Sequence, residues 1–153
     1  MKKIESRVVE QVTKRRRELT SLGRELIQAK GENPPGDVRE AASVIERFLE
    51  KESVSYETFE PQKGHASVMA TMGEGKPALI LCGHIDVVPA GDVSKWSFQP
   101  YSGDLRKGRI LGRGATDMKS GVAAMLMALA VVKDFEAELS GTVTVACVCD
   151  EEA

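Results

Sequence analysis

His84 and Asp86 stand two positions apart, just after an apolar run over residues 78–82. In an extended chain, residues two positions apart point to the same side. A histidine that binds a metal through one ring nitrogen usually donates its other N–H to a carboxylate or a carbonyl, which fixes its tautomer. The pair therefore has the pattern of a metal-ligating histidine, His84, supported by an acid, Asp86.

Three further carboxylates follow at points where the chain turns. Asp117 comes after a glycine-rich stretch, and Glu151 and Glu152 come after a second apolar run over residues 142–149. Histidine together with carboxylates suits zinc, and a carboxylate shared between two ions would give a two-metal hydrolytic site. Neighbours in an extended chain face different ways, so one glutamate can bind metal while the other handles a proton.

These features also have plainer interpretations. A lone aspartate in a glycine-rich turn usually caps a turn or a helix, and a pair of glutamates after a strand usually lies in a solvated loop. Cys147 and Cys149 share a strand face and offer another ligand pair, but their spacing is not that of a CxxC zinc motif. On residue types and spacing alone, a metal site and unrelated surface acids are equally supported.

Hydrophobic patterning predicts the elements that position these residues. Apolar residues recur at helical spacing or alternate at strand spacing. Strands that end in metal-competent side chains place a site at the C-terminal edge of the sheet, where open α/β folds bind ligands. The predicted helices cover residues 4–30, 37–49 and 122–133, and the predicted strands cover residues 54–60, 66–72, 78–82 and 142–149.

Three local features add detail to this outline. Asp37 and Glu40 have the spacing of a capping box at the start of the second helix. Trp96 and Phe98 are expected to pin a long loop over residues 87–104 to the core. His65 has no acidic neighbour in sequence, which favours a structural or exposed residue over a metal ligand.

The composition indicates an ordinary globular domain of 153 residues, with 42% hydrophobic and 29% charged residues. A net charge of −2 gives no argument for a nucleic-acid or membrane partner. The longest apolar run, residues 122–132, is too short to span a bilayer, and the N-terminus has no secretory signal pattern. Three cysteines in apolar runs are typical of reduced thiols, so we expect a cytoplasmic location.

Four linked motifs together resemble the sequence pattern of a known protein family. The segments GHIDVVP, KWSFQPYSG, GRGATDMKSG and CDEEA, in this order, resemble the zinc aminoacylase/carboxypeptidase family. That family includes acetylornithine deacetylase, succinyl-diaminopimelate desuccinylase and glutamate carboxypeptidase. The match runs from about Asn33 to Ala153. The resemblance implies an α/β fold, the zinc-exopeptidase-like catalytic domain, in which helices flank a central mixed sheet.

The resemblance also implies roles for the individual residues. His84 would bind one of two zinc ions, or cobalt ions, while Glu152 would bind the other. Asp117 would bridge both ions and would be followed by a cis peptide bond. Asp86 would support His84, and Glu151 would be the general base that activates a water held between the metals.

The implied activity is that of a metallopeptidase or amidohydrolase, a hydrolase that cleaves an amide bond in N-acyl amino acids or small peptides. The partner would be this small-molecule substrate. Family members often form a homodimer through an inserted lid domain, which residues 1–153 lack. The family has two further metal ligands downstream, so residues 1–153 would be the N-terminal part of a truncated catalytic domain. The alternative is an inactive folded fragment with an incomplete site, which associates through an exposed sheet edge.

Overall fold

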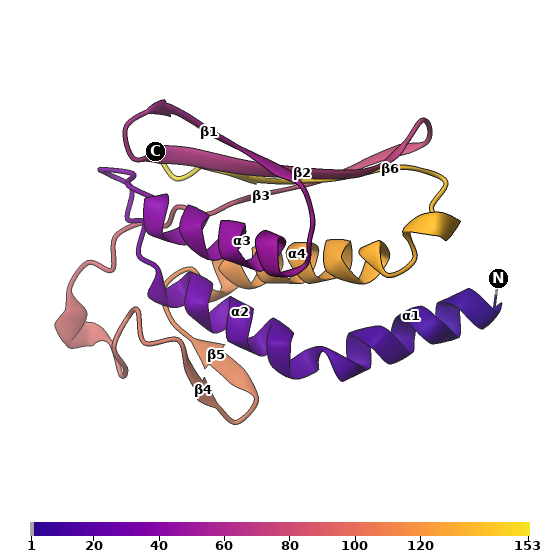
Figure 1. Ribbon diagram of the computed structural model, residues 1–153. Coiled ribbons are helices and arrows are strands. Elements are labelled where there is room, and N and C mark those ends of the chain that lie inside the picture. Colours follow the sequence, from indigo (N-terminus) through magenta and orange to yellow (C-terminus); the bar gives the residue numbers. More distant parts are fainter. Residues whose placement is uncertain (1) are drawn as a thin grey trace.

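A mixed four-stranded sheet is the frame of the molecule, as Figure 1 shows for the computed structural model, which describes residues 2–153. The strand order is β1-β2-β6-β3. β1 pairs antiparallel with β2, and β2 with β6, whereas β3 and β6 run parallel. The predicted central mixed sheet is therefore confirmed. Its strands are β1 (Tyr56–Gln62), β2 (His65–Glu74), β3 (Ala78–His84) and β6 (Gly141–Val148).

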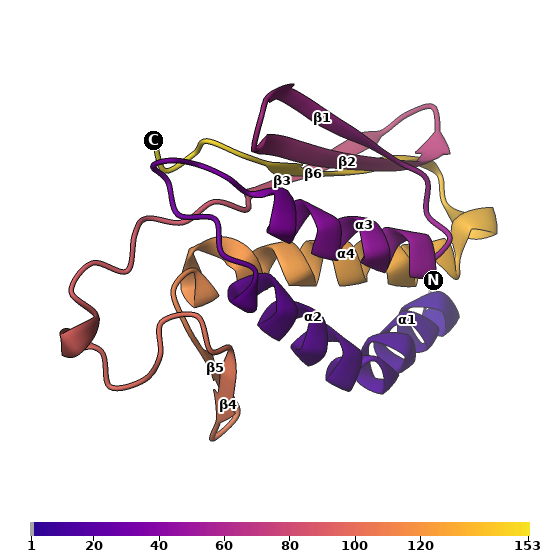
Figure 2. The ribbon, with the colours of Figure 1, turned by 60° about the vertical axis from the view of Figure 1, so that its left-hand side comes forward.

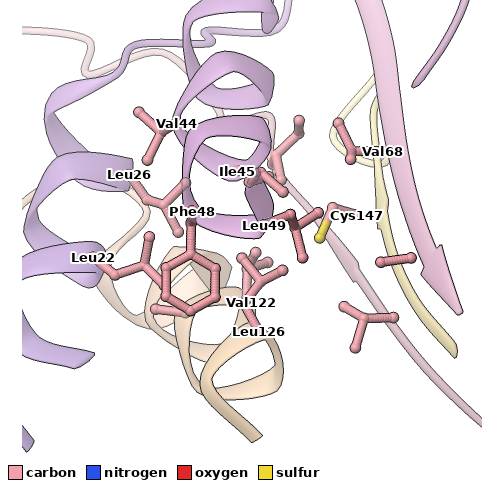
Figure 3. Close-up of a cluster of buried hydrophobic side chains, with 14 of the residues drawn as sticks. Leu22, Leu26, Val44, Ile45, Phe48, Leu49, Val68, Val122, Leu126 and Cys147 are labelled. Atoms are coloured by element: carbon pink, nitrogen blue, oxygen red, sulfur yellow. The ribbon is translucent and has the colours of Figure 1, made fainter. Parts of the chain in front are cut away.

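Helices pack on one face of this sheet and bury the core there. Alternate residues of β2 turn inward, as expected for a half-buried strand. These inward side chains pack against the buried apolar residues of α3 and α4. Leu22 and Leu26 of α2 pack on the other side of these helices and complete the cluster (Figure 3). The helices are α1 (Lys2–Lys14), α2 (Arg16–Gln28), α3 (Arg39–Lys51) and α4 (Ser120–Lys133).

The first predicted helix, residues 4–30, is wrong as a single element, because the chain breaks at Arg15 into α1 and α2. The half-buried Arg15 guanidinium lies 2.9 Å from Glu18 and 2.5 Å from Glu52. The break lets α2 turn its stripe onto the core, while α1 leaves Val9 64% exposed. The apolar spacing continues across the break, so periodicity alone did not reveal it.

The predicted capping box at the second helix is also wrong. α3 has Val38 at its N-cap position and no side-chain cap. The Asp37 carboxylate instead pairs with the Arg39 guanidinium at 2.5 Å. Glu40 accepts a hydrogen bond from the backbone N–H of Lys30 at 3.3 Å, so it ties α3 to the preceding turn rather than to its own N-terminus.

β3 is formed by an apolar run, but it is exposed along much of its length. In the described part of the chain it pairs only with β6, so one edge is open. Ile80 is 66% exposed and Leu79 is also exposed. Only Gly83 and His84, at its C-terminal end, are buried. The part of the strand that carries the candidate ligand is thus the part held by the rest of the fold.

The segment Ala115–Lys133 is long and apolar enough to cross a membrane by length and composition alone. It is not one continuous α-helix, because Asp117 and Met118 have non-helical backbone angles. Its regular part, α4, buries Val122, Leu126 and Leu129 in the core. It has the packing of a core helix.

The predicted loop after β3 projects from the end of the sheet (Figure 2). It contains a short 3-10 turn, η1 (Val93–Lys95), and leads to a hairpin of β4 (Asp104–Arg106) and β5 (Arg109–Leu111). Trp96 and Phe98 stack edge to face with ring centroids 5.4 Å apart. They pack on each other, and Arg113 stacks over Trp96, outside the main core cluster, so the expected core anchor is a local one. A last turn, η3 (Glu136–Glu138), precedes β6.

The three free thiols differ in their surroundings, which predicts an order of reactivity. Cys147 is buried, and burial raises the pKa of its thiol to about 12, whereas Cys82 is exposed on β3. The thiolate is the reactive form, so iodoacetamide at pH 8 should label Cys82 much faster than Cys147. Peptide mass spectrometry over a time course measures both rates. If Cys147 were labelled equally fast in native and denatured protein, its burial would be contradicted.

Candidate metal centre

The candidate ligands meet at one edge of the sheet. β3 ends at His84, and residues 150–152 follow the end of β6. Because β3 and β6 run parallel, both ends lie at the same edge. The turn η2 (Ala115–Lys119) enters α4 here and brings Asp117 to them. The structure therefore brings the candidate ligands together at the C-terminal edge of the sheet.

Three donor groups converge there. One ligand atom from each of His84, Asp117 and Glu152 lies within 4.8 Å of the other two. His84 Nε2 is 3.1 Å from Asp117 Oδ1 and 3.7 Å from Glu151 Oε2. The Asp117 side chain is 78% exposed and that of Glu151 is 60% exposed, whereas the histidine ring is buried. A fixed imidazole with carboxylates that face solvent is a donor set that fits a divalent ion such as zinc.

The backbone of Asp86, rather than its carboxylate, is the nearest partner of His84. The Asp86 carbonyl oxygen lies 3.0 Å from His84 Nδ1, while the nearest carboxylate oxygen is 3.5 Å away. Nδ1–H donates to the carbonyl, so Nε2 is the ring nitrogen that faces the site. Burial disfavours the charged ring, but hydrogen bonds to Asp117 and to this carbonyl raise the pKa of His84.

The Asp86 carboxylate holds the segment that carries the two glutamates. It is fully buried and accepts hydrogen bonds from the backbone N–H groups of Glu152 at 3.0 Å and Glu151 at 3.3 Å. Asn33 donates a third at 2.9 Å. Burial would raise the pKa of Asp86, but these donors outweigh it and lower that pKa. Asp86, which was predicted to support His84, thus also positions Glu151 and Glu152.

The Asp117 turn depends on two close contacts. Gly114 has φ +75°, and a Cβ there would lie 2.5 Å from Val87 Cγ1, so only glycine fits. Lys119 is fully buried and donates to the carbonyl of Ala29 at 2.5 Å, at the end of α2. Burial lowers the pKa of Lys119 to about 8. The peptide bond after Asp117 is cis, as the resemblance implied.

His65 has an acidic partner after all, although none lies near it in sequence. Asp150 Oδ2 is 2.7 Å from His65 Nδ1. Cys149 lies close enough to form a second group of candidate donors with them. The sequence also offered Cys147 and Cys149 as a pair of metal ligands. That pair is not supported, because Cys147 is buried in the core.

Sequence comparison places the C-terminal half of the chain among metallopeptidases. The sequence model of peptidase family M20/M25/M40 matches residues 80–153. A probable succinyl-diaminopimelate desuccinylase from Staphylococcus epidermidis is 33% identical over 113 residues, or 74% of this chain. That alignment covers 28% of the desuccinylase, so the chain spans less than a third of this relative's length.

Structural comparison extends the likeness to most of the chain. An M20 family metallo-carboxypeptidase from Sulfolobus solfataricus superposes with a TM-score of 0.77 and 28% identity, over 88% of this chain and 31% of that enzyme. A dinuclear metal binding peptidase of the M20 family from Bacillus subtilis has the same fold, with a TM-score of 0.58 and 20% identity over 85% of this chain and 34% of its own. Over residues 80–153, the chain is similar to the M20/M25/M40 family of peptidases.

Proposed function

We propose that this chain carries the metal ligands and the general base of a hydrolase that cleaves an amide bond in N-acyl amino acids or small peptides. The observation that carries the proposal is the convergence of His84, Asp117 and Glu152 with Glu151 beside them. The relatives support it, because a desuccinylase and a carboxypeptidase both hydrolyse amide bonds.

The donor set fits a divalent ion. His84 Nε2 and the carboxylates of Asp117 and Glu152 would hold it, and nitrogen with oxygen donors suits zinc or cobalt. When bound, such an ion supplies Lewis-acid polarisation of the substrate carbonyl and makes water more acidic. Because the carboxylates of Asp117 and Glu151 are largely solvent-exposed, a small substrate can approach this edge of the sheet.

Glu151 would move the proton. Its carboxylate lies 3.7 Å from His84 Nε2, within reach of a water molecule at the same donors. It would take a proton from the attacking water as the new C–O bond forms. It would then deliver that proton to the leaving nitrogen as the C–N bond breaks, so proton and electron pair both end on the amine.

A second candidate concerns residues 1–153 on their own. The three donors His84, Asp117 and Glu152 are too few to hold two ions at four-coordination. We propose that the isolated chain binds metal weakly and hydrolyses little, and that a longer protein supplies the remaining ligands. The open β3 edge with its exposed Ile80 favours self-association of the isolated chain.

Calorimetric titration with Zn²⁺, paired with hydrolysis assays on N-acetyl amino acids with zinc or cobalt, tests both candidates. We expect one weak site in the wild-type chain that His84→Ala weakens at least about tenfold. Two tight sites with turnover would overturn the fragment proposal and support a complete enzyme. Binding that is unchanged in the His84→Ala variant would overturn the metal site itself.

A further inference from the structure

The segment that carries Glu151 and Glu152 is held from two sides by polar contacts. On one side, the Asp86 carboxylate accepts the backbone N–H groups of both glutamates. On the other, the side chain of the preceding residue, Asp150, is bound by His65 and by Asn33. Neither His65 nor Asn33 belongs to the candidate ligand set. Their contacts nevertheless surround the segment that must place one ligand and one base.

Asn33 joins the two sides through a single nitrogen. Its Nδ2 lies 2.9 Å from Asp86 Oδ2 and 3.2 Å from Asp150 Oδ1. An amide nitrogen has two N–H donors and no charge, so it can bridge two carboxylates with one bond to each. The residue is buried, and its backbone N–H donates to the carbonyl of Val87 at 2.8 Å. The bridge is therefore fixed to the strand end that also delivers Asp86.

His65 holds the outer side of Asp150 in one tautomer. Gln62 Nε2 lies 3.2 Å from His65 Nε2, and an amide NH₂ group only donates, so that ring nitrogen accepts. The proton is therefore on Nδ1 and faces the Asp150 carboxylate at 2.7 Å. Gly36 packs against the pair so closely that a Cβ there would lie 2.9 Å from His65 Cε1.

A separate metal ion at His65, Cys149 and Asp150 is the competing interpretation of this cluster. Their donor atoms are close enough, but each is already in a hydrogen bond. Both ring nitrogens of His65 are occupied, and both oxygens of Asp150 accept from it. The Cys149 thiol accepts from Ser67 at 3.5 Å. The group is satisfied without an ion, which favours a structural connection.

We propose that Asn33 and His65 are positioning residues, which act through Asp150 and Asp86 to set Glu151 and Glu152 against His84. This inference rests on the proposed function, because it assigns these contacts to the geometry of the metal site. Loss of either donor leaves the ligands themselves intact but releases the segment that carries two of the site's carboxylates. Groups that orient ligands in this way typically change metal affinity by about 10–100-fold when removed.

The test compares Asn33→Ala, His65→Ala and His65→Asn. Asparagine keeps an N–H donor close to the position of His65 Nδ1, so His65→Asn is the conservative match for His65→Ala. We expect both alanine variants to weaken Zn²⁺ binding by about 10–100-fold in calorimetry, and His65→Asn to stay within about threefold of wild type. Titration with Co²⁺, followed by its visible absorption, reports whether the coordination geometry changes as well.

A second measurement needs no metal. Amide hydrogen exchange of the Glu151 and Glu152 N–H groups reports whether the segment is still held by Asp86. We expect both alanine variants to speed this exchange at least about tenfold, and His65→Asn to leave it near the wild-type rate. The urea midpoint of His65→Ala should stay close to wild type, because this residue lies at the start of β2 outside the core cluster.

The outcomes separate this inference from the proposed function. If His84→Ala leaves Zn²⁺ binding unchanged, the metal site fails, and the exchange rates alone decide whether Asn33 and His65 hold the segment. If His65→Ala matches wild type in both measurements, or His65→Asn is as impaired as His65→Ala, the positioning role is overturned. If Asn33→Ala does not fold, the two His65 variants still give the answer.

Discussion

Asp86→Ala is expected to destabilise the folded chain by about 2–4 kcal/mol and to weaken its metal binding further. The carboxylate is fully buried and accepts from Asn33, Glu151 and Glu152. Its removal leaves the backbone N–H groups of Glu151 and Glu152 without their acceptor and leaves Asn33 Nδ2 with Asp150 alone, and unpaired buried groups are costly. Urea unfolding followed by circular dichroism measures the loss.

Two controls make this result specific. Asp86→Asn keeps the size and one acceptor oxygen but turns an NH₂ group toward donors, so an intermediate loss is expected. Asp134→Ala removes an exposed carboxylate at the end of α4 and should change stability by less than about 0.5 kcal/mol. Equal stability of Asp86→Ala and Asp134→Ala would show that the buried hydrogen bonds contribute nothing net.

The Asp86 carboxylate also predicts that the stability of the fold depends on pH. Its donors lower the pKa of Asp86 in the folded state below the ordinary value of about 3.9. A lowered pKa means that the unfolded state takes up the proton first as the pH falls. The stabilisation is therefore complete above about pH 4 and is lost as the pH falls through the folded-state pKa. The difference between wild type and Asp86→Ala should shrink over that acidic range.

Glu151→Gln is expected to lower turnover by about 10²–10⁴-fold in a protein that hydrolyses N-acetyl amino acids, with little change in zinc affinity. The amide keeps the shape of the side chain but cannot take a proton from water. The backbone N–H of Glu151 still donates to Asp86, so the segment stays in place. Initial rates and zinc calorimetry on the same preparation separate the two effects.

Glu152→Gln is the matched variant one position along the chain. It removes a ligand charge from the donor cluster with His84 and Asp117, so metal affinity should fall at least about tenfold. The two neighbours thus have opposite expected signatures: one loses turnover and keeps metal, and the other loses metal. Full activity of Glu151→Gln would refute its assignment as the base.

The location of the candidate site was predictable because it depends on local signals. Apolar runs that end at His84 and near Glu151 identify strand ends, and parallel strands bring those ends together whatever the details of packing. The glycines before Asp117 likewise indicated the turn that carries this residue. Each of these signals lies within about ten residues of the side chain that it locates.

The contacts that hold the site were not predictable from such signals. Asn33 is 53 positions from Asp86, and His65 is 85 positions from Asp150, so sequence proximity could not pair them. The break at Arg15 has the same origin, because its partner Glu52 comes from the end of another helix. Long-range polar pairing depends on the finished fold, whereas helical and strand periodicity depends on each segment alone.

The strand order has a consequence for how this protein is made. β6 is the last strand of the described chain, yet it lies between β2 and β3 and makes all the contacts that join them into one sheet. During translation, the earlier strands therefore wait for a central partner that emerges after them. Folding of this kind relies on non-local pairing and is slow. The metal donors of His84 and Glu152 can meet only after β6 is inserted, so an ion cannot be held by both before that step.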